Sequence, residues 1–226
     1  MRTIQHHRMT RGLIFCVGLA LLGCEGRVAK NDSNKTAPKK ESTTETKVAE
    51  DNMPLPVQNE PFGKTEDGQE ITLFSLQNRK GMKVGVINRG AIITSVEVPD
   101  RDGKMANVTL AFDNPDEYLV NKPYLGGVCG RFANRIANGK FSLEGKDYTL
   151  FVGAGPHSLH GGKEHFMRKL WKAEPFQDKS GIRTGVKLSY TSADMEEGYP
   201  GTLKVSVTYS LNEDNELAFE YEATTD

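Results

Sequence analysis

The sequence has few cysteines, no long apolar run and almost no net charge. Three cysteines in 226 residues cannot form a disulfide-rich scaffold or a zinc site built from four cysteines. No apolar stretch reaches the roughly 18–20 residues that a membrane-spanning helix requires. The 29 basic and 30 acidic residues leave a net charge of −1, too little to attract nucleic acid by a global field. We therefore expect neither a disulfide scaffold, nor a polytopic membrane protein, nor a nucleic-acid-binding protein.

The N-terminus has the pattern of an export signal. Arg2, Arg8 and Arg11 precede an apolar stretch of about ten residues, 13–22, which suits a signal-peptide core. The stretch ends in Leu-Leu-Gly-Cys, and this sequence resembles a bacterial lipobox, in which the cysteine becomes the acylated N-terminus. We predict a lipoprotein signal peptide over 1–23 and a lipid anchor on Cys24, where each buried methylene adds about 0.8 kcal/mol to membrane binding. The alternative is an ordinary secretory signal with a chance cysteine.

The segment 24–58 has the composition of a tether. Lys, Glu, Thr, Asn and Ser dominate it, and large apolar side chains are nearly missing as far as residue 53. Such a segment cannot bury enough surface to offset the entropy lost on ordering. We expect it to hold a domain, residues 59–226, away from the membrane. The protein is then exported and faces the periplasm or the cell exterior.

Residues 59–226 have the pattern of an all-β domain. Short alternating runs, separated by turn residues, predict strands over 70–76, 83–87, 91–98, 107–112, 139–143, 147–152, 185–190, 203–211 and 216–223. Residues 212–215 predict a hairpin turn, and residues 115–119 predict one short helical turn. This spacing of strands favours a sandwich or a large antiparallel sheet.

The first candidate site lies in residues 130–139, Gly-Arg-Phe-Ala-Asn-Arg-Ile-Ala-Asn-Gly. Guanidinium and carboxamide groups offer several hydrogen bonds in fixed planes, which suits a polyhydroxylated ligand. On a regular strand Asn134 and Arg135 would point to opposite faces, so a shared ligand requires a turn or bulge. Composition alone favours the alternative, arginines in surface ion pairs beside a tight turn.

The second candidate site is the segment 156–162, Pro-His-Ser-Leu-His-Gly-Gly. A histidine followed by two glycines can reach a ligand from a loop, but an exposed turn histidine is an equal alternative. His157 and His160 lack a third ligand in a fitting pattern, so we expect no metal. Ser158 lacks the strand-turn-helix setting of a nucleophile. We expect His165, which has no such context, at the surface.

Taken together, these segments resemble the aldose 1-epimerase (galactose mutarotase) family. The motif at 130–139, the Ser-Leu-His-Gly-Gly at 158–162 and an acidic loop ending in Gly-Tyr-Pro-Gly at 198–201 agree with that family in order and spacing. The resemblance implies an antiparallel β-supersandwich and a hexose substrate. It also implies acid/base mutarotation without a cofactor, because only protons move.

The resemblance assigns roles to individual residues. Asn134 and Arg135 match the family's substrate-binding pair, and His160 matches a histidine that binds the sugar and assists proton transfer. Arg131 matches a motif position without an assigned role, and we expect the acidic loop to be structural. The family's acid histidine, a binding aspartate and its base glutamate are expected after Asp226, so that this chain is truncated to the N-terminal part of the domain. A non-catalytic carbohydrate-binding lipoprotein and a chain that does not fold stay open as alternatives.

Overall fold

The computed structural model describes residues 54–178 and 182–226. The signal peptide predicted at 1–23, the anchor predicted at Cys24 and the tether up to residue 53 lie outside these residues. Within the described part, no helix combines the length and the apolar character needed to cross a membrane.

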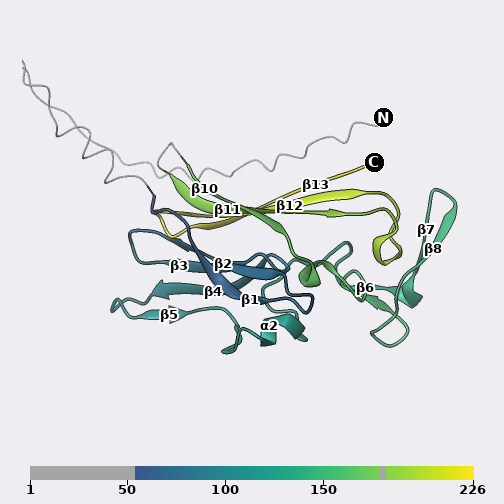
Figure 1. The fold of residues 1–226 in the computed structure, drawn as a ribbon, viewed down its shortest axis with the longest axis horizontal. Coiled ribbons are helices and arrows are strands. Elements are labelled where there is room, and N and C mark those ends of the chain that lie inside the picture. Colours follow the sequence, from purple (N-terminus) through teal and green to yellow (C-terminus); the bar gives the residue numbers. More distant parts are fainter. Residues whose placement is uncertain (1–53, 179–181) are drawn as a thin grey trace, which may run out of the picture. The chain divides into compact units, whose positions relative to one another are not determined.

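Two antiparallel sheets form the body of the described chain. One has five strands in the order β1-β2-β3-β4-β5, and the other has four strands in the order β10-β11-β12-β13. Their bounds are β1 (Gln58–Lys64), β2 (Glu70–Gln77), β3 (Lys83–Ile87), β4 (Ile92–Pro99), β5 (Met105–Asn107), β10 (Lys172–Gln177), β11 (Arg183–Ser192), β12 (Leu203–Asn212) and β13 (Leu217–Thr225). Figure 1 shows the green-to-yellow four-stranded sheet stacked on the blue-to-teal five-stranded sheet. The prediction of an all-β antiparallel sandwich is confirmed.

The main core lies between the two sheets. Alternate residues along each strand point inward, as the period of two requires. On the five-stranded sheet these include Val84 and Val86, and on the four-stranded sheet they include Val207 and Tyr209. Trp171 is 2% exposed and packs edge-on against Phe166, whose carbonyl oxygen accepts a hydrogen bond from the indole Nε1 at 3.1 Å.

A second, smaller core lies on the outer face of the five-stranded sheet. Ile71, Ile87 and Ile92 pack there against Tyr118, which is carried by the short helix α2 (Glu117–Val120). The Tyr118 hydroxyl donates a hydrogen bond to the carbonyl oxygen of Thr94 at 3.2 Å, which satisfies the buried phenol. The helical turn predicted at 115–119 is therefore confirmed, one to two residues later in the chain.

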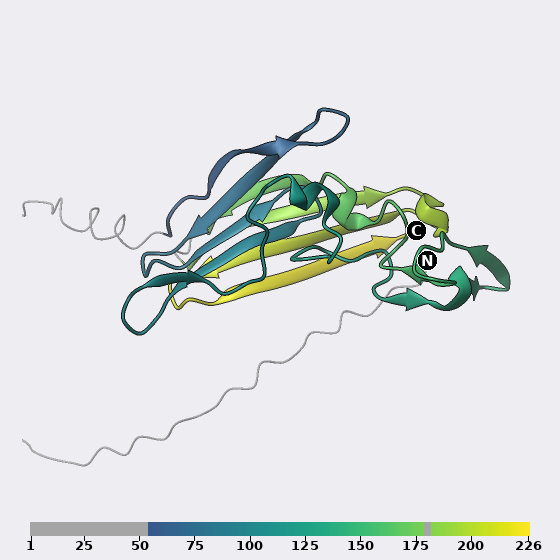
Figure 2. The same cartoon turned by 90° about the horizontal axis from the view of Figure 1, so that it is seen from below.

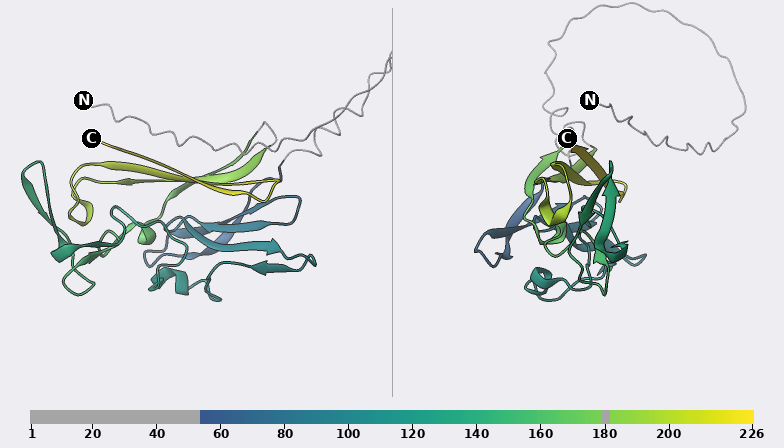
Figure 3. Two further views of the ribbon diagram at one scale, coloured as in Figure 1. Left: turned by 180° about the vertical axis from the view of Figure 1, so that it is seen from behind. Right: turned by 90° about the vertical axis from the view of Figure 1, so that its right-hand side faces the viewer.

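The candidate site is built at one end of the sandwich. Two short ladders lie there: β6 (Arg135–Ile136) pairs with β9 (Ser158–Leu159), and β7 (Lys140–Leu143) pairs with β8 (Lys146–Thr149). Three single 3₁₀ turns complete the elements: η1 (Ala137–Gly139), η2 (Phe166–Arg168) and η3 (Glu196–Gly198). Figures 2 and 3 show the β7–β8 hairpin extending beyond the end of the two sheets.

Most predicted strands are present, and the differences have local causes. The strand predicted at 107–112 is wrong, because β5 ends at Asn107, beyond which the Val108 N–H still donates to the Val96 carbonyl at 2.9 Å. The side-chain Oδ1 of Asn107 accepts the backbone N–H groups of Val96 at 3.0 Å and Thr109 at 3.1 Å, so these groups bond a side chain in place of a backbone carbonyl. β1 and β10 were not predicted, because each contains a proline. Both are edge strands, where a sheet can accept a proline.

Replacing Trp171 tests the main core. Trp171→Ala removes a fully buried side chain and should lower the free energy of unfolding by about 3–5 kcal/mol. Trp171→Phe keeps most of the packing and removes one of the two donors to the Phe166 carbonyl, which still accepts the Lys169 backbone N–H at 3.2 Å, and should cost about 0.5–1.5 kcal/mol.

Urea unfolding followed by far-UV circular dichroism is the suitable measurement, because Trp171 is the sole tryptophan and its fluorescence is lost in both variants. Val108→Ala is the control, since Val108 is 64% exposed and should change stability by less than about 0.5 kcal/mol. Equal stability of the Trp171→Ala and Val108→Ala proteins would contradict the core described here.

Candidate functional site

The site is organised around a pair of hydrogen bonds between Asn134 and His160. The His160 backbone N–H donates to the Asn134 carbonyl oxygen at 2.9 Å, and the Asn134 backbone N–H donates to His160 Nδ1 at 3.0 Å. Both residues flank the β6–β9 ladder and both have left-handed backbones, with φ of 63° and 51°. The left-handed turns end the ladder and let the imidazole fold back over the neighbouring chain.

This arrangement fixes the protonation state of His160. Because Nδ1 accepts a hydrogen bond from a backbone N–H, the neutral ring must carry its proton on Nε2. Burial lowers the pKa of His160, and the positive charge of Arg135 lowers it further. His160 is therefore a neutral imidazole at pH 7, with an Nε2–H group available as a hydrogen-bond donor.

Asn134 and Arg135 act on the same side of the chain although they are neighbours in sequence. The left-handed backbone of Asn134 breaks the alternation of a regular strand. The Arg135 Nη1 donates a hydrogen bond to Asn134 Oδ1 at 3.2 Å, so the two side chains touch. Both residues are exposed, which leaves a guanidinium and a carboxamide open to a ligand beside the imidazole.

A second histidine contact of the same kind lies at the other end of the ladder. The backbone N–H of Asn138, whose φ is 54°, donates to His157 Nδ1 at 3.2 Å. The segments 134–138 and 157–160 are thus joined at both ends by an imidazole that accepts a backbone N–H. His157 has a structural partner here.

Two aromatic side chains behind His160 were missed by the sequence analysis. The rings of Tyr124 and His160 are 4.7 Å apart between centroids, and those of Tyr124 and His165 are 5.3 Å apart. The prediction of a surface His165 is wrong: its side chain is buried, because the η2 turn draws the adjacent Phe166 and Met167 into the interior. Burial lowers the pKa of His165 to about 4, so this ring is neutral at pH 7. Tyr124 stands in a glycine-rich segment that carries no signal of its own.

Arg131 has a structural role that its motif position did not reveal. Its guanidinium donates five hydrogen bonds to the loop 192–201: Nε to Ser192 Oγ at 2.8 Å, and the two Nη atoms to the carbonyl oxygens of Ser192, Ala193, Pro200 and Gly201 at 2.6–3.0 Å. A planar guanidinium with five donors is suited to gathering several carbonyls of one loop.

The acidic side chains of that loop are used internally. Asp194 Oδ1 accepts the Gly201 backbone N–H at 2.6 Å, and Glu196 accepts the Tyr190 hydroxyl at 2.6 Å and pairs with Lys169 Nζ at 2.8 Å. Glu197 Oε2 accepts the backbone N–H of Lys163 at 2.7 Å. Glu197 thereby joins the loop to the chain that immediately follows His160, Gly161 and Gly162.

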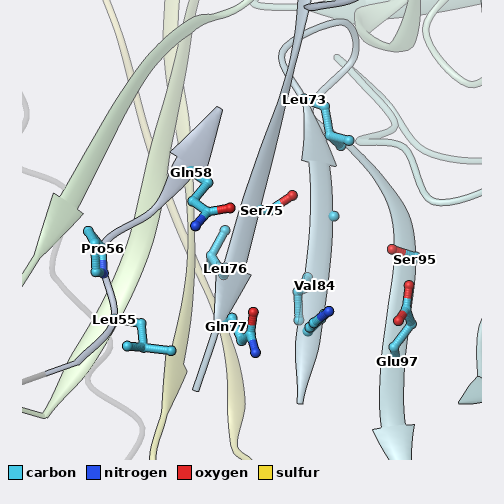
Figure 4. Close-up of a pocket in the computed structure, with 12 residues that line it drawn as sticks. Leu55, Pro56, Gln58, Leu73, Ser75, Leu76, Gln77, Val84, Ser95 and Glu97 are labelled. Atoms are coloured by element: carbon cyan, nitrogen blue, oxygen red, sulfur yellow. The ribbon is translucent and has the colours of Figure 1, made fainter. Parts of the chain in front are cut away.

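One surface hollow lies on the five-stranded sheet, and another adjoins the elements of the site. The larger, about 290 Å³, is on the five-stranded sheet, where Ser75 and Ser95 (labelled in Figure 4) are both paired with Gly85. None of the sequence-predicted site residues lines it. The smaller, about 180 Å³, adjoins His160 and is called the lateral pocket here; it is lined by Tyr124, Phe151, Gly153, Leu159, Gly162, Lys163, His165 and Arg168.

The side chains of the site suit a polar ligand with several hydroxyl groups. An uncharged imidazole donor, a guanidinium and a carboxamide lie together, and no cluster of three metal-ligating side chains occurs in residues 54–178 and 182–226. These groups lie on loops at one end of a two-sheet β-sandwich.

Comparison with known proteins identifies the family. The model of the aldose 1-epimerase family matches residues 72–226, and the chain belongs to this family. It is 45% identical over 153 residues to bovine (Bos taurus) galactose mutarotase, covering 68% of this chain and 42% of that protein. It is 34% identical over 168 residues to aldose 1-epimerase of Escherichia coli K12, covering 74% of this chain and 47% of that protein.

A solved structure agrees with this assignment. The crystal structure of galactose 1-epimerase from Lactobacillus acidophilus NCFM matches with a TM-score of 0.67 and 28% identity, covering 76% of this chain and 49% of that one. The chain thus spans about half the length of the relatives that it matches.

Two arginine variants separate scaffold from ligand contact. Arg131→Met removes the donor to four carbonyls of the loop 192–201 and should lower the free energy of unfolding by about 2–3 kcal/mol. Arg135→Met carries the same change of charge at an exposed position and should cost less than about 0.5 kcal/mol.

Urea unfolding gives the stabilities, and amide hydrogen exchange should show faster exchange within 192–201 only in the Arg131→Met protein. Equal stability and equal exchange in the two variants would show that Arg131 does not hold the loop.

Proposed function

We propose that this chain binds a hexose through Asn134, Arg135 and His160, and that it serves aldose 1-epimerase activity by interconverting the α and β anomers of the sugar. The observation that carries the proposal is the fixed tautomer of His160, which presents Nε2–H beside the Arg135 guanidinium and the Asn134 carboxamide. Membership of the family and the galactose mutarotase relatives support a hexose such as galactose or glucose.

Mutarotation needs ligand groups of this kind. A base removes the proton of the anomeric hydroxyl while an acid protonates the ring oxygen, and the open aldehyde then turns and closes again. Each well-placed acid or base contributes about 10²–10⁴-fold. A neutral Nε2–H can hold a sugar oxygen and stabilise the negative charge that develops on it. The Arg135 guanidinium adds directional donors that fix the sugar in one orientation.

The proposal assigns positioning of the sugar to the described part of the chain. The proposal assigns the roles of main acid and main base to none of the described residues. His160 would then assist the proton transfers as a donor, without being the main acid. No cofactor is needed, because the reaction moves only protons.

Replacing Arg135 tests the ligand site. Arg135→Ala should weaken galactose binding by about tenfold or more, the usual effect of losing a charged hydrogen-bond donor. Isothermal titration calorimetry with galactose and glucose measures the effect. Arg101→Ala is the control, because this side chain is 93% exposed in the turn between β4 and β5. Unchanged affinity in the Arg135→Ala protein would refute the site.

Polarimetry separates catalysis from binding. Saturable acceleration of galactose or glucose mutarotation supports the enzyme, whereas binding without acceleration supports the non-catalytic sugar-binding alternative.

We further propose that the protein is exported and anchored through a lipid on Cys24, with residues 24–58 as a polar tether. The basic start, the apolar stretch 13–22 and the Leu-Leu-Gly-Cys sequence support this proposal.

Cys24→Ala should therefore move the protein from the membrane to the soluble fraction and abolish labelling by a radioactive fatty acid. Cys16→Ala, inside the predicted signal core, is the matched control and should leave both unchanged. Membrane retention and labelling of the Cys24→Ala protein would contradict the anchor.

A further inference from the structure

The lateral pocket shares a wall with the proposed sugar site. Leu159 lines the pocket and is the β9 residue paired with Arg135 of β6. Tyr124 also lines the pocket, and its ring lies against that of His160. A single layer of side chains therefore separates the pocket from a ligand held by His160 and Arg135. A substituent or a neighbouring unit of that ligand could enter the pocket.

The pocket is large enough for a chemical group of useful size. Its volume of about 180 Å³ is roughly six times the 30 Å³ that one water molecule occupies in the liquid. Gly153 contributes to this space, because a Cβ there would lie 2.6 Å from the ring of Phe151, which belongs to the lining.

The walls combine aromatic surface with positive charge. Phe151 is 48% exposed although it is a large apolar side chain, and Tyr124 also belongs to the lining. Aromatic faces of this kind pack against the C–H groups of a sugar ring and bury apolar area. Lys163 and Arg168 are the charged residues of the lining at neutral pH, and no carboxylate belongs to it.

The charges around His165 agree with the positive charge of the pocket lining. Besides burial, the charges that lower the pKa of His165 are positive, with Arg168 the strongest of them. His165 is neutral at pH 7, and its Nδ1 is buried without a hydrogen-bond partner in the described structure. Two carboxylates lie beside the lining without belonging to it: Glu164 makes a long, exposed pair with Arg168 at 3.7 Å, and Glu197 accepts the backbone N–H of Lys163 at 2.7 Å.

From these observations we propose that the lateral pocket binds the carboxylate of an acidic sugar, so that the substrate class is a uronate or an oligosaccharide containing one. This inference rests on the proposed sugar site and adds its charge preference. Lys163 and Arg168 supply the attraction to the carboxylate, while Phe151 and Tyr124 supply the surface on which the sugar ring packs. A neutral hexose would use the His160 site and leave the pair of cations unused.

Calorimetric titrations of the whole chain with galactose, galacturonate, digalacturonate and lactose test the proposal. At low ionic strength galacturonate or digalacturonate should bind about three- to tenfold more tightly than galactose or lactose. The preference should fall when salt is raised, because exposed charges are screened. Preference for galacturonate places the carboxylate on the ring at the His160 site, and preference for digalacturonate alone places it on the adjoining unit.

A double variant provides the matched comparison. Lys163→Met with Arg168→Met keeps unbranched side chains and leaves the backbone N–H groups of both residues free to bond Glu197 and the His165 carbonyl. It should abolish the preference for acidic sugars and leave galactose binding unchanged. Arg101→Met with Lys104→Met removes the same charge from the turn between β4 and β5, at the other end of the sandwich (Figure 1), and should leave the preference intact.

The outcomes distinguish this inference from the proposed function. Galactose binding without any preference for acidic sugars, or a preference that survives the Lys163 and Arg168 substitutions, overturns the inference alone. Equal binding of lactose and digalacturonate also overturns it, because the aromatic wall would then act without the charges. Failure of every sugar to bind overturns the proposed function, and the inference with it.

Discussion

The two hydrogen bonds between Asn134 and His160 are the constraint on which the rest of the site depends. One is an ordinary backbone bond, but in the other the imidazole Nδ1 takes the place of a carbonyl and accepts the Asn134 N–H. That substitution ends the two-residue β6–β9 ladder, turns the imidazole toward the ligand side and selects the Nε2–H tautomer. Position and protonation state of His160 therefore have one common cause.

The surrounding structure makes this small arrangement rigid. The β6–β9 ladder has only two residues in each strand, too few to be stable alone. Arg131 donates hydrogen bonds to carbonyl oxygens of the loop 192–201 and so holds this loop in place. Glu197 of the loop in turn accepts the backbone N–H of the residue that follows Gly162. The loop connects the end of β11 to the start of β12, and both of these strands belong to the sandwich. An arginine of the binding motif thus acts on the site through the scaffold.

Local patterns predicted most of the longer strands and failed where distant contacts decide. β3 and β12 were found from sequence, although both are buried on both faces over much of their length, whereas β10 contains Pro175 and pairs with β11 at the sheet edge. Asn107 bonds Thr109, two residues later, and also Val96 on β4, and this second contact lies outside the run of residues that predicted the strand.

The candidate site was predictable to a different degree. Asn134, Arg135 and His160 were found through a family resemblance, and the structure brings them together at one corner. The tautomer of His160, the loop-holding role of Arg131 and the burial of His165 depend on contacts across 26 residues or more of sequence, or on the packing of Tyr124 between two imidazoles. Such properties follow from the three-dimensional arrangement and have no signature in composition or spacing.

The tautomer of His160 is the most direct test of this account. Long-range ¹⁵N–¹H correlation spectra of the imidazoles, recorded at neutral pH with and without galactose, report which ring nitrogen carries the proton. The account predicts that His160 is neutral with its proton on Nε2, and that galactose shifts the Nε2 resonance while the Arg101→Ala control protein behaves identically. A proton on Nδ1, or an Nε2 resonance that ignores saturating galactose, would contradict it.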